Sequence, residues 1–349
     1  MAMSHHADVQ SLKAVVLHSD VSAEAGADEK DALVQAAVVS SALSELGYEP
    51  TTMPFSLNVA HIIDMLRDLR PVFVFNLVET MAGQGSLIHV APSILDFLNI
   101  PYTGARTEAT FLTSNKVLAK QILNAAGIAT PLLFLPHESC AGHFVEGTYI
   151  IKAVWEHAST WLNSDSIIHA RDPHELREAM ASRQKQLGMA CFAEAFIEGR
   201  EFNLSLLAGN EGPHVLSPAE IRFDDFPPGK VRVVDYLSKW VEDSFEYHHT
   251  PRCFDFPKED EPLLHQLKAL ALQCWQVFGL RGYARVDFRI DNTGRPWVLE
   301  VNTNPCLSPD GGFYAALERS GLNFTQAMER IIRDAISPDI FALGDDKVL

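Results

Sequence analysis

A segment in the C-terminal third of the chain alternates apolar and polar residues around a turn, as a β-hairpin does. Side chains on a strand alternate between its two faces, so Arg285 and Asp287 share one face of the first strand, and Glu300 and Asn302 share one face of the second. If the connecting loop has an even number of residues, for instance 292–295, we expect all four side chains to lie together. An amphipathic hairpin with a polar outer face is the alternative explanation.

Three of these side chains are suited to binding a metal ion. Asp287, Glu300 and Asn302 offer two carboxylates and an amide oxygen, which are hard ligands of the kind that Mg²⁺ prefers. In proteins Mg²⁺ keeps several waters and takes the rest of its shell from substrate phosphates. The hairpin therefore points to ATP.

Composition excludes some classes of partner. A chain of 349 residues with 47% hydrophobic and 21% charged content is globular and long enough for two or three domains. Its formal charge of −17 argues against binding nucleic acid or an anionic membrane. The five cysteines are widely spread, and residues 1–10 lack the apolar run of a signal peptide. We expect a cytoplasmic protein.

The first hundred residues alternate strand and helix signals. Strands are predicted at 14–17 and 72–75, with an amphipathic helix over 31–46 between them. This alternation favours an open, largely parallel sheet whose ligand sites lie beyond the carboxyl ends of the strands, so residues 76–86 should line that edge. Gly83-Gln-Gly85 is half of a dinucleotide fingerprint, which argues against NAD.

Later segments are predicted in the same way. Helices are expected at 114–126 and 261–278, and a strand at 148–152. Residues 218–257 are polar and acidic and contain proline, so we expect a long excursion there.

Seven short motifs are weak matches singly, but their order and spacing are specific. They are Phe75–Leu77, Ile100–Gly104, Asn115–Lys116, Ile150–Lys152, Glu194–Glu201, Asp235–Lys239 and Glu300–Pro305. Through them the chain resembles the ATP-grasp superfamily, and within it the D-alanine–D-alanine ligase family, over nearly its whole length. The resemblance implies an α/β ATP-grasp fold. An N-terminal Rossmann-like parallel-sheet domain (1–112) would precede a central (113–196) and a C-terminal (197–349) α+β subdomain that clasp ATP.

The resemblance also assigns contacts to the phosphates of ATP. Lys116, Lys152 and Lys239 occupy the family's lysine positions. Lys152 ends an apolar strand, where a lysine is costly to bury without an anion beside it. Lys116 shares a helix face with Lys120, so a solvated lysine stripe is the alternative there, and Lys239 could equally lie on the surface.

The adenosine contacts come from one strand–loop–strand segment. By resemblance Glu194 and the backbone of Ala195, Phe196 and Ile197 meet the adenine edge, and Phe196 and Ile197 face the ring. Glu201 would accept hydrogen bonds from the ribose hydroxyls.

A loop after residue 153 corresponds to a flexible clasp over the phosphates. Glu156 and Ser159 match the family pattern, and the resemblance places Glu156 with the ATP-binding residues and Ser159 with the catalytic residues. His157 and Trp161 stand where glycines are typical, and Ala158 replaces a serine. The tryptophans of this loop could instead form a structural pair.

The reaction that the resemblance implies is activation of a carboxylate. The cofactors would be ATP and Mg²⁺, as two ions with Mn²⁺ as an alternative, held by Asp287, Glu300 and Asn302. The γ-phosphoryl group would move to the carboxylate, and an amine would attack the acyl phosphate. Arg285 and Lys239 would stabilise the charge, so no enzyme nucleophile is expected. The partners would be small amino-acid or peptide substrates, and a homodimer is allowed.

Five departures from the family concern the amino-acid pocket. The N-terminal signature is absent, Glu79-Thr80 replaces a His-Gly pair, Ala158 and Trp240 lack hydroxyls, Cys306-Leu-Ser308 replaces Gly-Met-Thr, and Gly311 falls where a serine would bind a terminal carboxylate. We expect D-alanine to be a poor substrate and a basic amino acid a better one. The alternatives are a ligase for another amino acid or peptide, and an ATP-binding regulatory or interaction protein that has lost ligation.

Overall fold

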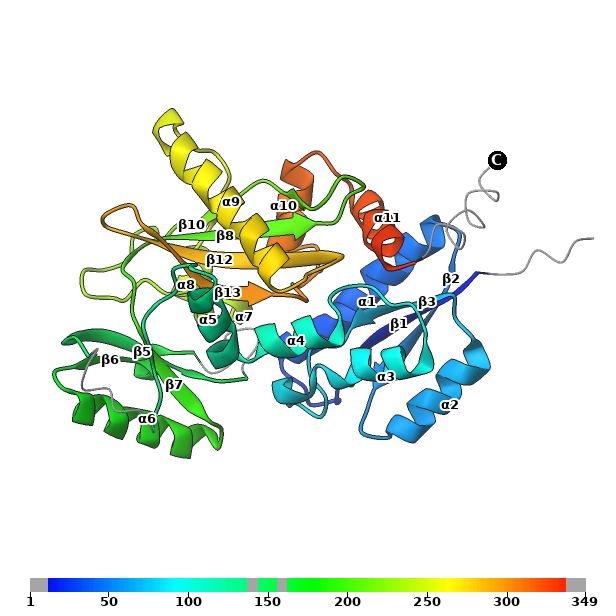
Figure 1. The fold of residues 1–349 in the computed structure, drawn as a ribbon, viewed down its shortest axis with the longest axis horizontal. Coiled ribbons are helices and arrows are strands. Elements are labelled where there is room, and N and C mark those ends of the chain that lie inside the picture. The colour runs from blue at the N-terminus through cyan, green and yellow to red at the C-terminus, as the bar shows by residue number, and fades with distance from the viewer. Residues whose placement is uncertain (1–11, 137–143, 156–161, 337–349) are drawn as a thin grey trace, which may run out of the picture.

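The computed structural model describes residues 12–136, 144–155 and 162–336, which form three β-sheets with helices around them (Figure 1). In the N-terminal sheet, β1 (Lys13–Ser19) lies between β2 (Glu49–Phe55) and β3 (Phe73–Leu77), and both pairings are parallel. The parallel sheet expected from the sequence is confirmed. Strand β2 was not predicted, and its Pro50 and Pro54 are tolerated because β2 is an edge strand.

Helices α1 (Ala27–Glu45) and α2 (Val59–Leu69) connect these strands. The helix predicted at 31–46 begins four residues earlier, because Asp28 and Glu29 are favourable in a first turn, where the helix dipole attracts negative charge. After β3 the chain continues through α3 (Val90–Leu98) and α4 (Thr107–Ser114).

The helix predicted at 114–126 is interrupted at its start. Asn115 leaves the helical conformation, ends α4, and caps α5 (Lys116–Ala125) by accepting hydrogen bonds from Val117 N and Leu118 N at 3.1 and 3.0 Å. This cap fixes Lys116 as the first residue of α5.

The central sheet has the antiparallel order β4-β7-β5-β6. Its strands are β4 (Leu133–Phe134), β5 (Gly147–Ala153), β6 (Ile167–Ala170) and β7 (Cys191–Ala195). Helix α6 (Pro173–Leu187) packs on it through the buried side chains of Leu176 and Met180.

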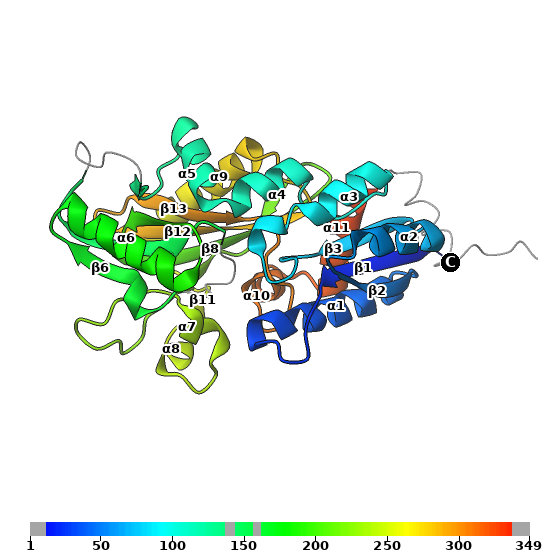
Figure 2. The same cartoon turned by 90° about the horizontal axis from the view of Figure 1, so that it is seen from below.

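The large sheet has the order β11-β10-β8-β12-β13, with β9 paired to β8. The strands are β8 (Gly199–Leu207), β9 (His214–Val215), β10 (Ala219–Ile221), β11 (Arg252–Cys253), β12 (Tyr283–Asp291) and β13 (Pro296–Asn302). Helix α9 (Glu261–Val277) covers one face, and α7 (Tyr236–Trp240) and α8 (Phe245–His248) project from the other side (Figure 2). The excursion predicted at 218–257 is therefore partly wrong, because β10 and β11 within it extend the sheet.

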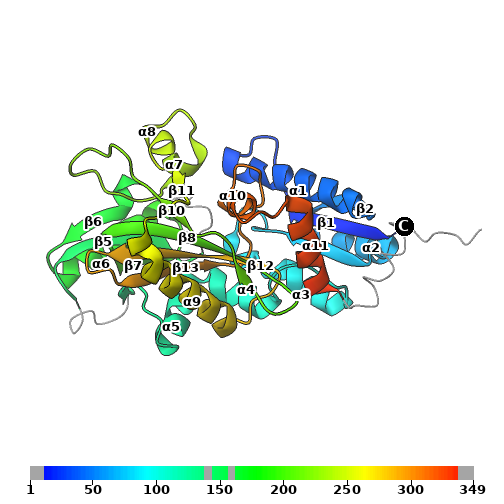
Figure 3. The same ribbon diagram turned by 90° about the horizontal axis from the view of Figure 1, so that it is seen from above.

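The last two helices return to the N-terminal sheet. Helices α10 (Gly312–Arg319) and α11 (Phe324–Ala335) share a core with α1 and β1 that includes Val16, Leu43, Phe313 and Ile332 (Figure 3). The same core includes Leu207 of β8 and Tyr283 of β12, so it joins the large sheet to the N-terminal sheet. Within the described ranges, every helix is too short or too polar to cross a membrane.

Candidate active site

A cavity of about 430 Å³ lies between the central sheet and the large sheet. It gathers side chains from both sheets, from α7 and from the N-terminal domain. Eleven of the residues predicted from the sequence line it, namely Lys152, Glu194, Ala195, Phe196, Ile197, Glu201, Lys239, Arg285, Asp287, Glu300 and Asn302.

The four hairpin side chains lie on one face, as predicted, but the pairing of the two strands near the turn differs from the predicted register. Arg285 lies opposite Asn302, and Asp287 lies opposite Glu300. Nearer the turn Ile290 lies opposite Pro296, which corresponds to an odd-numbered loop and would place the acids on opposite faces. A one-residue bulge at Leu299 restores the alignment.

The two carboxylates of the hairpin are held by neighbouring side chains. Arg285 donates to both oxygens of Asp287 at 2.7 and 2.8 Å, and Asn203 Nδ2 donates to Asp287 Oδ1 at 2.8 Å. Lys116 Nζ lies 2.7 Å from Glu300 Oε2. Asn203 was not among the predicted residues, although it lies two residues after Glu201 on the same face of β8.

This donor set fits Mg²⁺ as a partial ligand shell. Asp287, Glu300 and Asn302 are all oxygen ligands, and none is a soft sulfur or nitrogen donor. In the described parts of the chain no three His, Cys, Asp or Glu residues gather as a self-sufficient metal site. A Mg²⁺ ion here would need water and substrate oxygens to complete its shell, as it does when it accompanies a nucleotide.

The charge state of Glu300 agrees with that role. Burial alone would raise the pKa of Glu300, but Lys116, Lys239 and Arg285 beside it outweigh burial and hold the pKa well below its ordinary value. Glu300 is therefore anionic at neutral pH.

A second buried carboxylate organises the lysines of the central sheet. Glu194 lies 2.6 Å from Lys120 through one oxygen and 2.6 Å from Lys152 through the other. Lys120 is only 3% exposed and also donates to Thr130 Oγ1 and to the carbonyl of Leu299 in the bulge. The solvated lysine stripe considered from the sequence is wrong for Lys120, which fixes α5 to β7 and β13.

The segment predicted to face adenine begins at the end of β7. The N–H groups of Ala195 and Phe196 already donate to Leu132 O and Thr148 O, each at 2.9 Å. Backbone contacts to a nucleotide at this segment would therefore have to use other groups.

Glu201 is paired with an arginine that the sequence analysis missed. Arg289 Nη2 lies 2.8 Å from Glu201 Oε2, and the Arg289 guanidinium also lies 5.5 Å from the ring centre of Phe196. This pair holds Glu201 at the cavity wall.

Lys239 borders the cavity from α7. Asp235 caps α7 by accepting from Ser238 N at 3.0 Å and Ser238 Oγ at 2.8 Å. Burial and the charge of Arg285 lower the pKa of Lys239, and Glu300 and Asp287 partly oppose this. A further contact, from Tyr236 on α7 to Asp28 Oδ1 at 3.3 Å, joins this segment to the N-terminal domain.

Two predicted residues, Glu156 and Ser159, lie outside the described residues, and so does Trp161. Trp155 is described, and its ring centre lies 5.4 Å from that of Phe111. Trp155 therefore packs on α4, and the tryptophan pair considered from the sequence stays a prediction because Trp161 is outside the described residues.

The end of the cavity nearest the N-terminal domain is acidic. Gln35 Nε2 donates to Asp31 Oδ2 at 2.9 Å and to Glu79 Oε1 at 3.1 Å, so the two carboxylates lie side by side. Burial raises the pKa of Glu79 to about 7 against the lowering effects of the Gln35 hydrogen bond and Arg285, and the charges of Asp31 and Asp28 contribute to the rise. Glu79 is therefore half ionised near neutral pH.

Cys306 and Gly311 border the same end. Burial raises the pKa of the Cys306 thiol, whose Sγ donates to Asp31 at 3.1 Å, so the thiol stays protonated and is not a nucleophile. A Cβ atom on Gly311 would lie 2.8 Å from Ser308 O, so the backbone here has no room for a serine.

Comparison with known proteins identifies the family. A family model described as D-ala D-ala ligase C-terminus matches residues 164–333. A D-alanine–D-alanine ligase from Sinorhizobium fredii is 30% identical over 308 residues, covering 87% of this chain and 92% of that protein. This chain belongs to the D-alanine–D-alanine ligase family. A second member, from Moorella thermoacetica, is 28% identical over 88% of this chain and 94% of its own length.

Solved structures of D-alanine–D-alanine ligases share the fold. The Bacillus anthracis enzyme, solved in complex with ATP, superimposes with a TM-score of 0.68 at 19% identity and covers 97% of this chain and 100% of its own. D-alanyl-alanine synthetase A from Vibrio cholerae gives a TM-score of 0.69 at 17% identity and covers 93% of this chain and 98% of its own. The ATP-grasp fold predicted from the motifs is confirmed.

Proposed function

We propose that the protein is an ATP-dependent carboxylate–amine ligase of the D-alanine–D-alanine ligase type, acting through an acyl phosphate. The observation that carries this proposal is the composition of one cavity. Lys152 and Lys239, the hairpin acids and Arg285 all border it, and Lys116 reaches the hairpin through Glu300. Cations on two walls and anions on the floor suit a triphosphate with its metal.

ATP would lie between the two sheets. Adenine would sit against Phe196 and Ile197, and the ribose hydroxyls would donate to the oxygen of Glu201 that Arg289 leaves available. Lys152 and Lys116 would bind the phosphates, and Glu194 orients Lys152 for this contact.

The chain's own groups would stabilise the transfer of the γ-phosphoryl group. Bound Mg²⁺ would supply charge neutralisation on the phosphate oxygens, held by Asp287, Glu300 and Asn302. Lys239, fixed by the cap of α7, would approach the phosphates from the opposite side. The acceptor is a substrate carboxylate, whose oxygen forms the new bond to phosphorus as ADP leaves.

An amine would then attack the acyl phosphate, forming the C–N bond and releasing phosphate. Arg285 borders the cavity and has N–H groups beyond the two that bind Asp287, and these would stabilise the oxyanion as it develops. No side chain needs to form a covalent bond with the substrate.

The direct test is a screen of amino acids and short peptides for ATP-dependent phosphate release, with the joined product identified by mass spectrometry. Release that depends on an amino acid and yields a product with a new amide bond supports the proposal. ATP binding without such release from any substrate would favour the regulatory alternative.

Glu201→Gln should weaken ATP binding without greatly changing kcat. Ribose contacts persist through the reaction, so their loss affects ground state and transition state alike. We expect the KM for ATP to rise about 10-fold, which corresponds to one hydrogen bond to a charged group. Glutamine keeps an acceptor for Arg289. A large fall in kcat at unchanged ATP affinity would contradict the ribose assignment.

Glu79→Gln should remove a preference for amino acids with a basic side chain over those with a neutral one. Because the pKa of Glu79 is about 7, its negative charge develops as pH rises through neutrality, and the wild type should favour basic over neutral amino acids more strongly at higher pH. The ratio of kcat/KM for the two substrate types, measured across this range, tests the idea. A ratio that is flat with pH and unaltered in the variant would refute it.

The same raised pKa predicts a stability effect. Folding favours the protonated form of Glu79, so the raised pKa contributes to the free energy of unfolding. This contribution is fully present below the unfolded pKa of 4.5 and is lost as the pH rises through the folded pKa of about 7.

A further inference from the structure

Arg289 lines the cavity and joins two segments of the chain that border it. It lies on β12 directly opposite Glu201 of β8, and both residues are buried, at 3% and 8% exposed. Besides its ion pair with Glu201, the Arg289 guanidinium donates to Gly199 O at 3.0 Å and to Arg232 O. One side chain therefore binds both β8 and the segment that precedes α7.

That segment, residues 222–235, has no helix or strand of its own. It connects β10 to α7, and Val233 and Val234 within it line the cavity. Because it has no strand ladder or helical hydrogen bonds, its position depends on individual contacts with the rest of the protein. The bond from Arg289 to Arg232 O is one of these contacts, and it lies next to the two cavity-lining valines.

Two aromatic rings hold the Arg289 guanidinium as well. Its central carbon lies 5.5 Å from the ring centre of Phe196 and 5.3 Å from that of Phe223. A guanidinium is attracted to the face of such a ring. Phe196 belongs to the turn predicted to face adenine, whereas Phe223 belongs to the 222–235 segment. Arg289 thus contacts this segment near its start and near its end.

The end of the segment determines where Lys239 lies. Asp235 caps α7 through Ser238, and α7 carries Lys239 to the border of the cavity. If the Arg232 carbonyl lost its donor, residues 232–234 could shift, and the cap and Lys239 would shift with them. A displacement of about 1 Å in a group that contacts the reacting atoms can lower a rate by about 100-fold.

The same guanidinium determines how Glu201 is held. Removing the partner of a buried carboxylate leaves its charge uncompensated, so the side chain turns toward water or takes up a proton. Either change would remove the fixed acceptor that the ribose hydroxyls require.

We propose that Arg289 is a positioning residue that sets nucleotide recognition and phosphoryl transfer together, because it orients Glu201 and fixes the 222–235 segment that leads to Lys239. This inference rests on the proposed ligase function and adds to it a coupling between the ribose site and the phosphate site.

The variants separate the two contacts of Arg289. Arg289→Met keeps an extended side chain but removes the donors and the charge. Glu201→Gln changes the ribose side alone, and Phe223→Leu changes the segment side alone. The matched control is Arg295→Met, on the same hairpin, where the arginine is exposed, lies 4.2 Å from the ring centre of Trp297 and is outside the cavity lining.

Two of the measurements require no ligation. Calorimetry compares the affinities for ADP and for dideoxy-ADP, which lacks both ribose hydroxyls, and so reports on ribose recognition. Limited digestion of the native protein with trypsin reports on the segment, because its Arg222, Lys230 and Arg232 are exposed. The third measurement is kcat and KM for ATP, with the best substrate from the screen.

We expect the wild type to bind ADP about 10-fold more tightly than dideoxy-ADP, the equivalent of one hydrogen bond to a charged group. Arg289→Met should lose this preference, be cut in the segment about 10-fold faster, and have a kcat about 10- to 100-fold lower. Glu201→Gln should lose the ribose preference but resist trypsin, and Phe223→Leu should do the reverse. Arg289→Lys should recover part of both properties, because lysine keeps the charge but loses the planar fork.

Arg295→Met should behave as the wild type. An Arg289→Met variant that keeps the ribose preference, the trypsin resistance or both would overturn the coupling and leave the ligase intact. Loss of both, in a protein that ligates no substrate, would support the role of Arg289 and overturn the ligase. If Arg289→Met is cut throughout the chain, Arg289→Lys decides instead. Partial loss of both properties would then support the inference, and any other pattern would overturn it.

Discussion

Glu300→Gln is expected to lower kcat for ATP turnover by about 1000-fold or more while the fold stays intact. Glutamine would hold the metal ion poorly, and the positive charge of that ion would neutralise the negative charge that develops on the phosphate. Glutamine has nearly the shape of glutamate, so the effect isolates the charge. It also leaves Lys116, Lys239 and Arg285, all of which act on Glu300, with less counter-charge.

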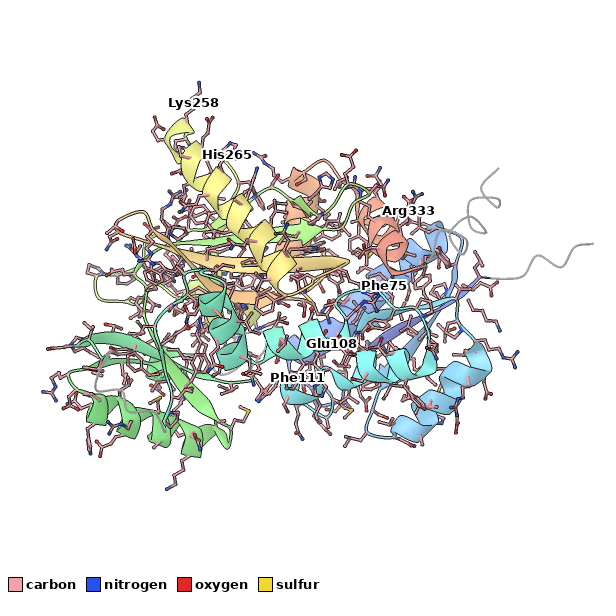
Figure 4. All side chains as sticks on the ribbon, in the orientation of Figure 1. Phe75, Glu108, Phe111, Lys258, His265 and Arg333 are labelled. Atoms are coloured by element: carbon pink, nitrogen blue, oxygen red, sulfur yellow. The ribbon has the colours of Figure 1, made fainter. Side chains whose placement is uncertain are left out.

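The measurements are phosphate release at saturating ATP, affinity for Mg²⁺–ATP, and the thermal unfolding midpoint. The matched control is Glu108→Gln, which makes the same change on α4 at an exposed position away from the cavity lining (Figure 4). Glu108→Gln should keep full activity. Phosphate release from Glu300→Gln that equals the control would remove the metal assignment for this hairpin.

The sequence predicted the floor of the site because its signal is local. Alternation with period two places Asp287 and Glu300 on one face of their strands, whatever surrounds them. The bulge at Leu299 could not be predicted, because the contact made there, from Lys120 of α5 to the Leu299 carbonyl, joins segments far apart in the sequence. Asp287 and Glu300 share a face, as predicted, because the one-residue bulge compensates for a turn with an odd number of residues.

The missed residues share a different property. Asn203 and Arg289 belong to no motif, and the role of each depends on a partner on another strand, Asp287 for Asn203 and Glu201 for Arg289. A hydrogen bond or ion pair between residues that are about 80 to 90 positions apart in the chain leaves no periodic pattern in a single sequence. The short strands β10 and β11 were missed for a related reason, because two or three residues are too few to show alternation.

Helix boundaries show the limit of pattern reasoning at a finer scale. The apolar period predicted one helix from Ser114, whereas Asn115 caps α5 and separates it from α4. The side-chain cap was readable in principle, since asparagine is a preferred N-cap residue. Its consequence, which is to orient Lys116 toward Glu300, required the fold.

Glu194→Ala is expected to lower the free energy of unfolding by about 3–5 kcal/mol, because it leaves a buried lysine without its counter-ion. Glu194 is 1% exposed and neutralises Lys120, which is 3% exposed. Thr130 and the Leu299 carbonyl would remain as neutral acceptors for that ammonium, and neither carries charge. The control is Glu198→Ala, an exposed glutamate in the turn that follows β7, which should change stability little.

The dependence of this loss on pH follows from the sign of the shift. Burial would raise the pKa of Glu194, but Lys120 and Lys152 outweigh it and hold the pKa below 4.5. The stabilisation is therefore present above the unfolded pKa and is lost as pH falls through the folded value. Urea unfolding of wild type and variant at several pH values should show curves that converge in acid. Adding Lys120→Met to Glu194→Ala should recover much of the stability, because the unpaired charge is then removed. A Glu194→Ala variant no less stable than Glu198→Ala would show that Lys120 is neutral in the folded protein and that the pair contributes no net stabilisation.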